Sequence, residues 1–183
     1  MTIAIIIGVV VLLILIFIFS TYNSLVNLRN LVKEAFSTMD VYLKKRWDLI
    51  PNLVETVKGY ASHEKETLEG VVNLRNKAYD TMSDNEKITA NSELKSGLSK
   101  LLMLAENYPD LKANQNFMDL SNQLSTVESE IANSRKYYNA VVRDYNNKIE
   151  MFPSNVVASM FKFKLREMFE TDEAQRENVK VEF

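Results

Sequence analysis

The sequence predicts an all-α fold in which an N-terminal transmembrane helix continues into a long antiparallel up-and-down four-helix bundle. A short C-terminal amphipathic segment and an acidic tail follow. Three observations predict this fold. An unbroken apolar run extends from Ile3 to Phe19, the 183-residue chain contains only 4 glycines and 3 prolines, and later segments repeat apolar residues at helical spacing.

The apolar run from Ile3 to Phe19 contains no charged or amide side chain, and its length is at the short end of what crosses a bilayer. A soluble core helix rarely lacks a polar face over such a length, which disfavours a buried helix. A secretory signal would place Lys or Arg before the run and small residues after it, and neither is present. We therefore expect residues 1–21 to be a retained transmembrane anchor.

The first two bundle helices are predicted from apolar residues three and four positions apart. The first continues from the anchor, and its apolar face is formed by Leu25, Leu28, Val32, Ala35, Met39 and Tyr42. The second is expected to begin near Asp48, a residue type that caps helix N-termini, with Pro51 tolerated in its first turn. Its apolar face is formed by Leu53, Val57, Tyr60, Leu68, Val71, Leu74 and Ala78.

The third and fourth helices have clearer signals. Ser83-Asp84-Asn85-Glu86 is a capping box that starts the third helix, and Asn107-Tyr108-Pro109-Asp110 ends it. The fourth helix has a heptad-like seam typical of coiled coils and up-and-down bundles, and it ends before Pro153. This seam is formed by Phe117, Leu120, Leu124, Val127, Ile131, Ser134, Tyr138, Val141 and Tyr145.

These elements predict three parts: an anchor over 1–21, a helical bundle over 22–152, and an amphipathic C-terminal segment with an acidic tail over 153–183. The tail is acidic because residues 167–183 carry six acidic and two basic side chains. The dipeptide Tyr-Asn recurs at Tyr22-Asn23, Tyr138-Asn139 and Tyr145-Asn146, which we interpret as reuse of one packing solution.

Composition excludes several function classes. The formal net charge is -2 without a clustered basic surface, so no nucleic-acid partner is expected. There is no cysteine for thiol chemistry or a disulfide. His63-Glu64 begins like a zinc-protease motif, but residue 67 is Thr and the chain has no second histidine. We expect no catalytic residues, no metal and no cofactor, and therefore a protein that is not an enzyme.

Five motifs occur in order across nearly the whole chain. They are Tyr22 to Val26 (YNSLV), Lys45 to Val54 (KRWDLIPNLV), Gly59 to Glu64 (GYASHE), Glu106 to Lys112 (ENYPDLK), and Glu128 through Tyr138-Asn139. By these motifs the chain resembles the LemA family of bacterial membrane proteins. The combination of RxDLIPNLV with ExYPxLK is far more specific than a heptad pattern.

The resemblance implies a single-pass protein of the bacterial inner membrane, with a short N-terminus outside and a cytoplasmic helical bundle. Arg29 and Lys33, which follow the span, favour the same orientation, because cytoplasmic flanks are rich in basic residues. The resemblance places the break between the first two helices at Arg46-Trp47-Asp48. It implies no established activity, although one branch of the family is associated with formation of internal membranes.

Seven polar residues lie in or near these motifs and beside apolar seams. A charge that is desolvated at such a position must be paired, or it destabilises the bundle. We interpret the seven as a structural polar network that joins helix ends, and a ligand site is the alternative. They are Arg46, Asp48, Asn52, Glu106, Glu128, Arg135 and Asn139.

The segment 156–169 combines large apolar side chains with cations. Phe161, Lys162, Phe163, Lys164 and Phe169 are predicted to contact lipid headgroups or a neighbouring subunit. The alternative is that the segment caps the base of its own bundle.

Two functional classes follow from these features. The first is a non-enzymatic, membrane-anchored scaffold that forms homo-oligomers through helix faces and organises or shapes the bilayer. The second is a membrane-tethered receptor or adaptor whose bundle binds another protein or peptide, with another membrane protein among the candidate partners. A role as accessory subunit of a membrane protease or transporter is a weaker third alternative.

Overall fold

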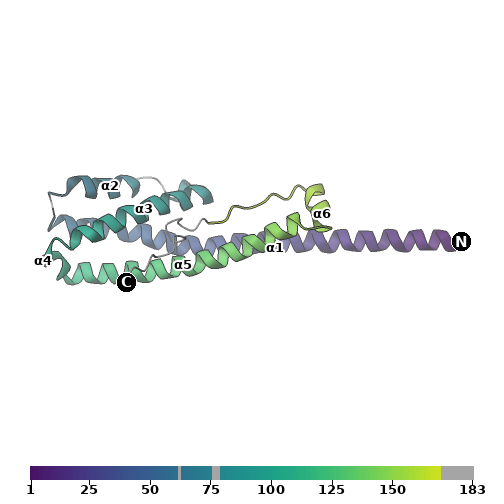
Figure 1. Ribbon diagram of the computed structural model, residues 1–183, viewed down its shortest axis with the longest axis horizontal. Coiled ribbons are helices and arrows are strands. Elements are labelled where there is room, and N and C mark those ends of the chain that lie inside the picture. The colour runs from purple at the N-terminus through teal and green to yellow at the C-terminus, as the bar shows by residue number, and fades with distance from the viewer. Residues whose placement is uncertain (62, 76–78, 170–183) are drawn as a thin grey trace, which may run out of the picture. The chain divides into compact units, whose positions relative to one another are not determined.

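The computed structural model describes residues 1–61, 63–75 and 79–169, with the side chain of Arg75 left out. Of the described residues, 85% are in helices and none is in a β-strand, which confirms the predicted all-α class. The elements in chain order are α1 (Thr2–Lys58), α2 (Lys65–Arg75), the 3-10 helix η1 (Tyr79–Thr81), α3 (Asp84–Ala105), α4 (Pro109–Lys112), α5 (Gln115–Glu150) and α6 (Ser154–Met160) (Figure 1).

The N-terminal part of α1 is fully exposed within the single chain. Its most apolar stretch of 18 residues has no buried position, and α1 is the one helix among the described residues that is long and apolar enough to cross a membrane. A membrane anchor accounts for these properties, because an exposed helix without a polar face is stable in lipid and unfavourable in water.

The predicted helix break at Arg46-Trp47-Asp48 is wrong. Helix α1 continues through Pro51 and ends at Lys58. A proline inside a helix removes one backbone hydrogen bond and costs about 3 kcal/mol. This cost is offset because Trp47, Ile50 and Leu53 continue the buried face of α1 and are at most 3% exposed. The predicted second helix is therefore divided between the end of α1 and the short α2.

The start of the third helix is confirmed. Ser83 is the N-cap of α3: its Oγ accepts a hydrogen bond from the N–H of Glu86, and the Glu86 carboxylate accepts one from the N–H of Ser83 at 2.7 Å. The Ser83 bonds lower the pKa of the Glu86 carboxyl. The fourth helix is confirmed as α5, which ends at Glu150, before Pro153.

The chain divides into two compact units, each with its own packing. One unit comprises residues 36–135. The other comprises residues 1–35 together with the residues from Lys136 onward. In the 36–135 unit, α3 packs on α2: a Cβ atom added at Gly97 would lie 3.2 Å from Val71 and 3.5 Å from Leu74.

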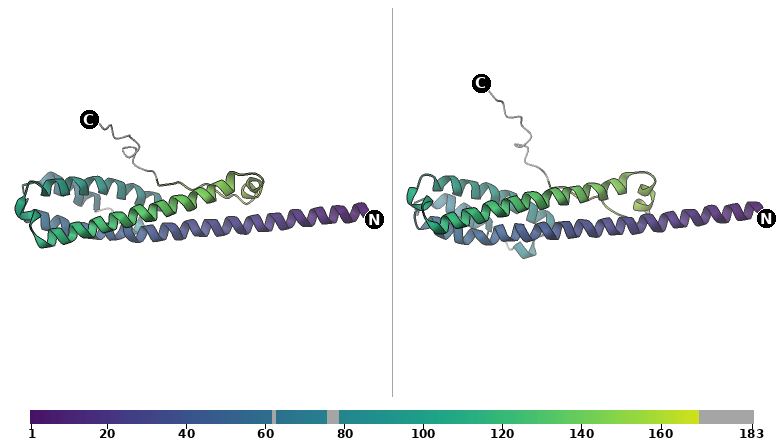
Figure 2. Two further views of the ribbon diagram at one scale, coloured as in Figure 1. Left: turned by 60° about the horizontal axis from the view of Figure 1, so that its bottom comes forward. Right: turned by 90° about the horizontal axis from the view of Figure 1, so that it is seen from below.

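The predicted amphipathic C-terminal segment is helical over only part of its length. Helix α6 ends at Met160, and residues 163–169 form no helix or strand. We call residues 161–169 the strap; Figures 1 and 2 show it turning back after α6 and running along α5. The predicted acidic tail lies mostly in residues 170–183, outside the described residues.

Candidate functional site

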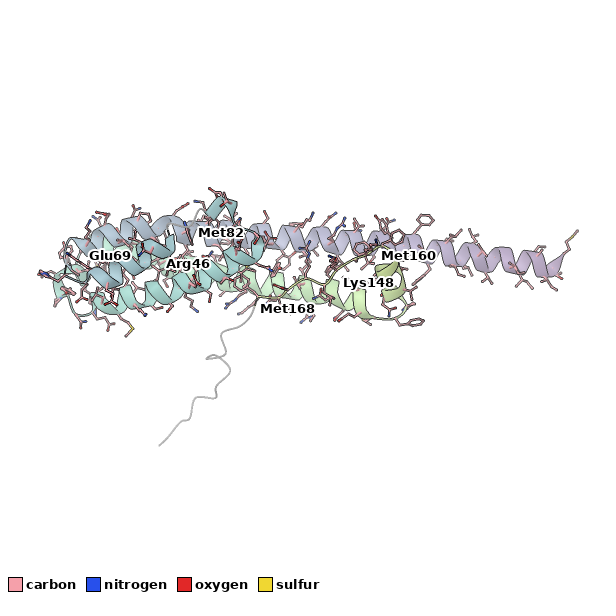
Figure 3. The ribbon with its side chains drawn as sticks, turned by 90° about the horizontal axis from the view of Figure 1, so that it is seen from above. Arg46, Glu69, Met82, Lys148, Met160 and Met168 are labelled. Carbon is pink, nitrogen blue, oxygen red and sulfur yellow. The ribbon has the colours of Figure 1, made fainter. Side chains whose placement is uncertain are left out.

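Arg46 on α1 is the one charged side chain that is buried among the described residues, with 3% of its surface exposed (Figure 3). Each of its guanidinium nitrogens donates a hydrogen bond. Nη1 donates to Glu128 Oε1 at 2.6 Å, Nε donates to Asn91 Oδ1 at 3.2 Å, and Nη2 donates to Asn91 Oδ1 at 2.8 Å and to the Asn91 carbonyl at 2.9 Å. The guanidinium therefore joins α1, α3 and α5 within one unit.

Asn91 is the acceptor that sequence reasoning missed. It is 1% exposed on α3, and its Nδ2 donates to the carbonyl of Lys87 at 3.0 Å. The sequence carries a signal for it, because Asn91 lies three residues before Leu94 on the apolar face that continues through Leu98 and Leu101. A polar residue at a core position of a helix indicates a hydrogen-bonded partner.

A second polar cluster lies beside Arg46 in the same unit. Asp40 accepts hydrogen bonds from the Tyr79 hydroxyl at 2.6 Å and from Lys87 Nζ at 2.8 Å. The Tyr79 ring also packs on Trp47, with ring centroids 5.2 Å apart. Burial and the Asp40 carboxylate raise the pKa of Tyr79 well above its usual value, so its hydroxyl remains a donor across the physiological range.

The structure joins two of the seven predicted network residues directly, Arg46 and Glu128. Asp48 is exposed and pairs with Lys44 at 2.6 Å, one turn earlier on α1. Asn52 and Glu106 are exposed, and Arg135 is half-buried on α5. Asn139 belongs to the other unit. These placements make Arg46, Asn91 and Glu128 the centre of the polar cluster.

Asparagine side chains of α5 bind the backbone of the strap. Asn139 Nδ2 donates to the Phe169 carbonyl at 2.9 Å, and its Oδ1 accepts from the Phe169 N–H at 2.8 Å. Asn146 makes the same pair of bonds with Arg166, at 2.8 and 2.9 Å. Tyr138 adds a bond from its hydroxyl to the Glu167 carbonyl at 3.1 Å. The strap thus pairs with amides of α5, much as a strand pairs with its neighbour.

The recurring Tyr-Asn dipeptide therefore has a specific role in α5. The two copies lie seven residues apart, which puts both asparagines on the same face of the helix. Tyr145 is 1% exposed and Tyr138 is 6% exposed, so both tyrosine rings are buried, while the asparagine side chains bind the strap. Sequence reasoning found the repetition but not its partner.

The predicted contact residues of the strap have different surroundings. The Phe161 and Phe163 rings lie 4.6 and 5.8 Å from the ring of Tyr22 on α1. Lys162 and Lys164 are exposed, whereas Phe169 is buried and is therefore not part of an exposed contact surface. These contacts place part of the strap against its own unit, which is the alternative that the sequence left open.

Several apolar side chains around α6 are exposed, including Phe152 at 82%, Val156 at 60% and Met160 at 55% (Figure 3). Exposed apolar residues gathered in this way form a candidate contact surface.

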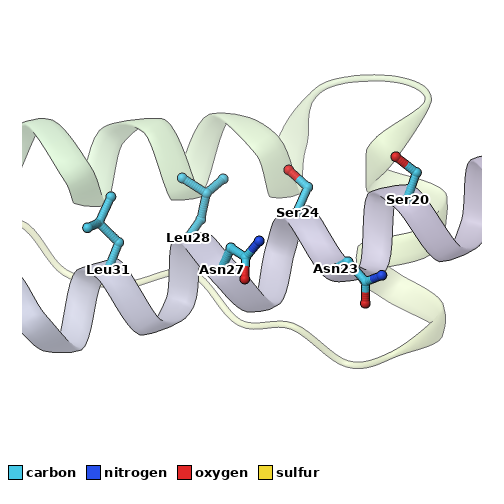
Figure 4. A pocket seen from close by; sticks show the side chains of 6 residues that line it. All are labelled: Ser20, Asn23, Ser24, Asn27, Leu28 and Leu31. Carbon is cyan, nitrogen blue, oxygen red and sulfur yellow. The ribbon is translucent and has the colours of Figure 1, made fainter.

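A shallow, open groove with both polar and apolar lining residues follows one flank of α1 immediately after the apolar run. It has a volume of about 620 Å³ and is lined by Ser20, Asn23, Ser24, Asn27, Leu28 and Leu31 (Figure 4). The four polar residues are small or carry amides, so they allow a second helix to approach closely and can form hydrogen bonds with it.

The sequence model of the LemA family matches residues 35–183, which is more than half of the chain. The chain belongs to the LemA family. The match contains Arg46, Asn91, Glu128 and the strap, and it begins after the groove on α1.

This LemA-family chain is similar to a protein LemA of Metamycoplasma hominis, with 28% identity over 158 residues that cover 86% of this chain and 72% of the relative. It is also similar to magnetosome proteins MamQ 1 and MamQ 2 of Paramagnetospirillum magneticum. Each is 22% identical over 175 residues, which cover 81% of this chain and 64% of the relative, so the chain spans less than two thirds of their length.

Proposed function

We propose that this LemA-family chain is a non-enzymatic, membrane-anchored helical scaffold that self-associates and organises the bilayer. The LemA family is not a known family of enzymes. The observation that carries the self-association is the groove of α1, since it is open in the single chain and directly follows the apolar run.

The occupant we propose for the groove is α1 of a second copy. Ser20 and Ser24 are one turn apart, a spacing that lets two helix backbones come close in or near a membrane. Asn23 and Asn27 follow the same flank and supply donors and acceptors between helices. Anchoring confines all copies to one plane with the same groove at the same height, which raises their effective concentration.

We expect Ser24→Cys to form a disulfide-linked dimer when membranes containing the full chain are oxidised. The chain has no native cysteine, so each product reports one site. The matched control is Lys33→Cys, an exposed position about 180° around α1 from Ser24 at 3.6 residues per turn. Non-reducing electrophoresis measures the dimer.

Equal dimer from both positions would mean random collision and would contradict the groove as an interface. Absent dimer, together with a monomer in native mass measurement, would favour the tethered adaptor.

The antiparallel four-helix bundle belongs to this proposal, applied to the unit 36–135. Residue pairs support the helix directions. Arg46 on α1 bonds Glu128 on α5, and Tyr60 just past the end of α1 bonds Asn114 just before α5. The partner's residue number falls as the residue number on the α1 side rises, so α1 and α5 run in opposite directions. Between α1 and α3, Asp40 bonds Lys87 whereas Arg46 bonds Asn91, so these helices run the same way.

We also propose that the N-terminus lies outside a bacterial inner membrane and the helical body lies in the cytoplasm. In intact cells an impermeant thiol reagent should label Thr2→Cys and leave Ser96→Cys, an exposed position on α3, unlabelled until the cells are lysed. Labelling of Ser96→Cys in intact cells with protection of Thr2→Cys would reverse the orientation. Labelling of both before lysis would contradict the anchor.

A further inference from the structure

A cavity of about 360 Å³ in the unit that contains the strap is surrounded by basic side chains. Arg29 of α1 lines it together with Lys162, Lys164 and Arg166 of the strap, and Tyr145 of α5 also lines it. Four cations around one small cavity repel one another, so the arrangement favours an anion at their centre.

The charges around this cavity have no acidic partner within the part of the chain that the structure describes. Among residues 1–61, 63–75 and 79–169, no carboxylate lies within ion-pair distance of Arg29, Lys162, Lys164 or Arg166. Arg29 Nε is buried and has no hydrogen-bond acceptor, while the guanidinium lies 5.6 Å from the centroid of the Phe163 ring. The Nε atom is enclosed by protein atoms, so an oxyanion in the cavity would accept from the other N–H groups of the guanidinium.

Two other features of the cavity concern its shape and its polar groups. Lys162 has a φ of 58° because it is the C′ residue of the α6 C-cap, in which the Phe163 N–H donates to the Ala158 carbonyl and the Lys162 N–H donates to the Ser159 carbonyl; this cap turns the chain into the strap that lines the cavity. Burial raises the pKa of Tyr145 even though Arg166 and Arg29 act in the opposite direction, so its hydroxyl remains neutral and able to donate.

The cavity lies close to the level at which α1 leaves the lipid, if α1 is anchored as proposed above. Arg29 is ten residues after the apolar run, a rise of about 15 Å, and Tyr22, which contacts the strap, is three residues after it, a rise of about 4.5 Å; each headgroup layer is about 5–8 Å thick. The Tyr22 ring contacts Phe161 and Phe163, which flank Lys162. The Cα–Cβ bonds of a helix tilt toward its N-terminus, so the side chain of Arg29 leaves the helix toward the membrane.

We propose that this cavity binds the phosphate group of an anionic phospholipid headgroup. The planar guanidinium of Arg29 presents several N–H donors to phosphate oxygens, and Lys162, Lys164 and Arg166 add positive charge. A zwitterionic choline lipid binds more weakly, because its quaternary ammonium is repelled by the same four cations. The inference rests on the membrane anchoring of the proposed function, but not on self-association.

The test titrates the full chain in neutral detergent with short-chain phosphatidylglycerol, short-chain phosphatidylcholine and inorganic phosphate, and counts bound ligand by native mass spectrometry. We expect saturable binding of phosphatidylglycerol, weakened about tenfold or more by Arg29→Gln. Lys164→Gln and Lys162→Gly should weaken it as well, and they serve as variants whose exposed side chains can be changed without affecting folding.

Matched controls are Arg143→Gln and Lys136→Gln, which remove exposed cations of α5 outside the cavity and should leave binding unchanged. Equal loss in the controls would show diffuse surface attraction and overturn the site. Inorganic phosphate that binds as tightly as the lipid would make the ligand a soluble phosphate and overturn the lipid assignment. Absence of lipid binding would overturn the proposal as well, while the Ser24→Cys dimer and the Thr2→Cys labelling report separately on the proposed function.

Discussion

Replacement of Arg46 by Met should lower the free energy of unfolding by about 2–4 kcal/mol, because it leaves the buried acceptors of Asn91 unsatisfied, whereas the Glu128 side chain is 37% exposed and can be hydrated. Asn91, 1% exposed, would lose the donors to its side-chain oxygen and its carbonyl, and Glu128 would lose its 2.6 Å partner. For a chain of this size the melting temperature in mild detergent should fall by about 10 °C.

The chain offers a matched control for this prediction. Lys44→Met breaks a pair of the same length, Lys44 with Asp48 at 2.6 Å, but both side chains are exposed, at 39% and 55%. An exposed pair contributes at most about 1 kcal/mol. A loss in Arg46→Met no larger than the loss in Lys44→Met would show that the buried cluster is not a stabilising centre.

A combined variant separates the cost of an unpaired group from the value of the pair. Replacing Arg46, Asn91 and Glu128 together by Met, Leu and Gln removes the unsatisfied groups that Arg46→Met leaves behind. We expect the combined variant to recover part of the lost stability, because a buried ion pair is often no more stabilising than apolar residues of similar volume.

Replacement of both Asn139 and Asn146 by Ala should release the strap from α5 while leaving the helices folded. The two asparagines make four hydrogen bonds to the backbone of Phe169 and Arg166. At about 1 kcal/mol net for each bond, amide exchange at these two positions should accelerate by about two orders of magnitude or more. Hydrogen exchange of the full chain, read by mass spectrometry over the strap, measures this release.

Asn147→Ala is the matched control for the replacement of Asn139 and Asn146, since Asn147 is exposed and adjoins Asn146 on the same helix. Exchange in the strap should not change in this variant. If amide exchange in the strap were as slow in the double variant as in the unaltered chain, the asparagine hydrogen bonds would not be responsible for attaching the strap to α5. If exchange rose equally over α5, the asparagines would stabilise the helix itself.

The main elements of the fold could be predicted from the sequence because their signals are local. The span is visible as an apolar run, and the start of α3 is visible as the capping box at Ser83. Pro51 shows the limit of such reasoning. A proline usually breaks or starts a helix, yet α1 continues to Lys58, because burial of Trp47, Ile50 and Leu53 outweighs the missing hydrogen bond.

The candidate sites could be predicted only in part. The sequence indicated Arg46 and Glu128 as charges beside apolar seams, but 82 residues separate them, and no spacing rule pairs residues so far apart. Asn91 had a usable signal as a polar residue on an apolar helix face. The strap had none, because its partners bind backbone groups, and every residue except proline carries the same N–H and C=O.

The sequence by itself determined that this protein is helical, that it has one segment suited to a bilayer, and that it belongs with LemA proteins, because propensity, periodicity and motif are properties of neighbouring residues. Only the tertiary structure decided which acceptors surround Arg46, which side chains hold the strap, and which cations gather around Arg29. These depend on residues far apart in the chain, and their positions are fixed by the packing of helix faces and by the requirement that buried polar groups find partners.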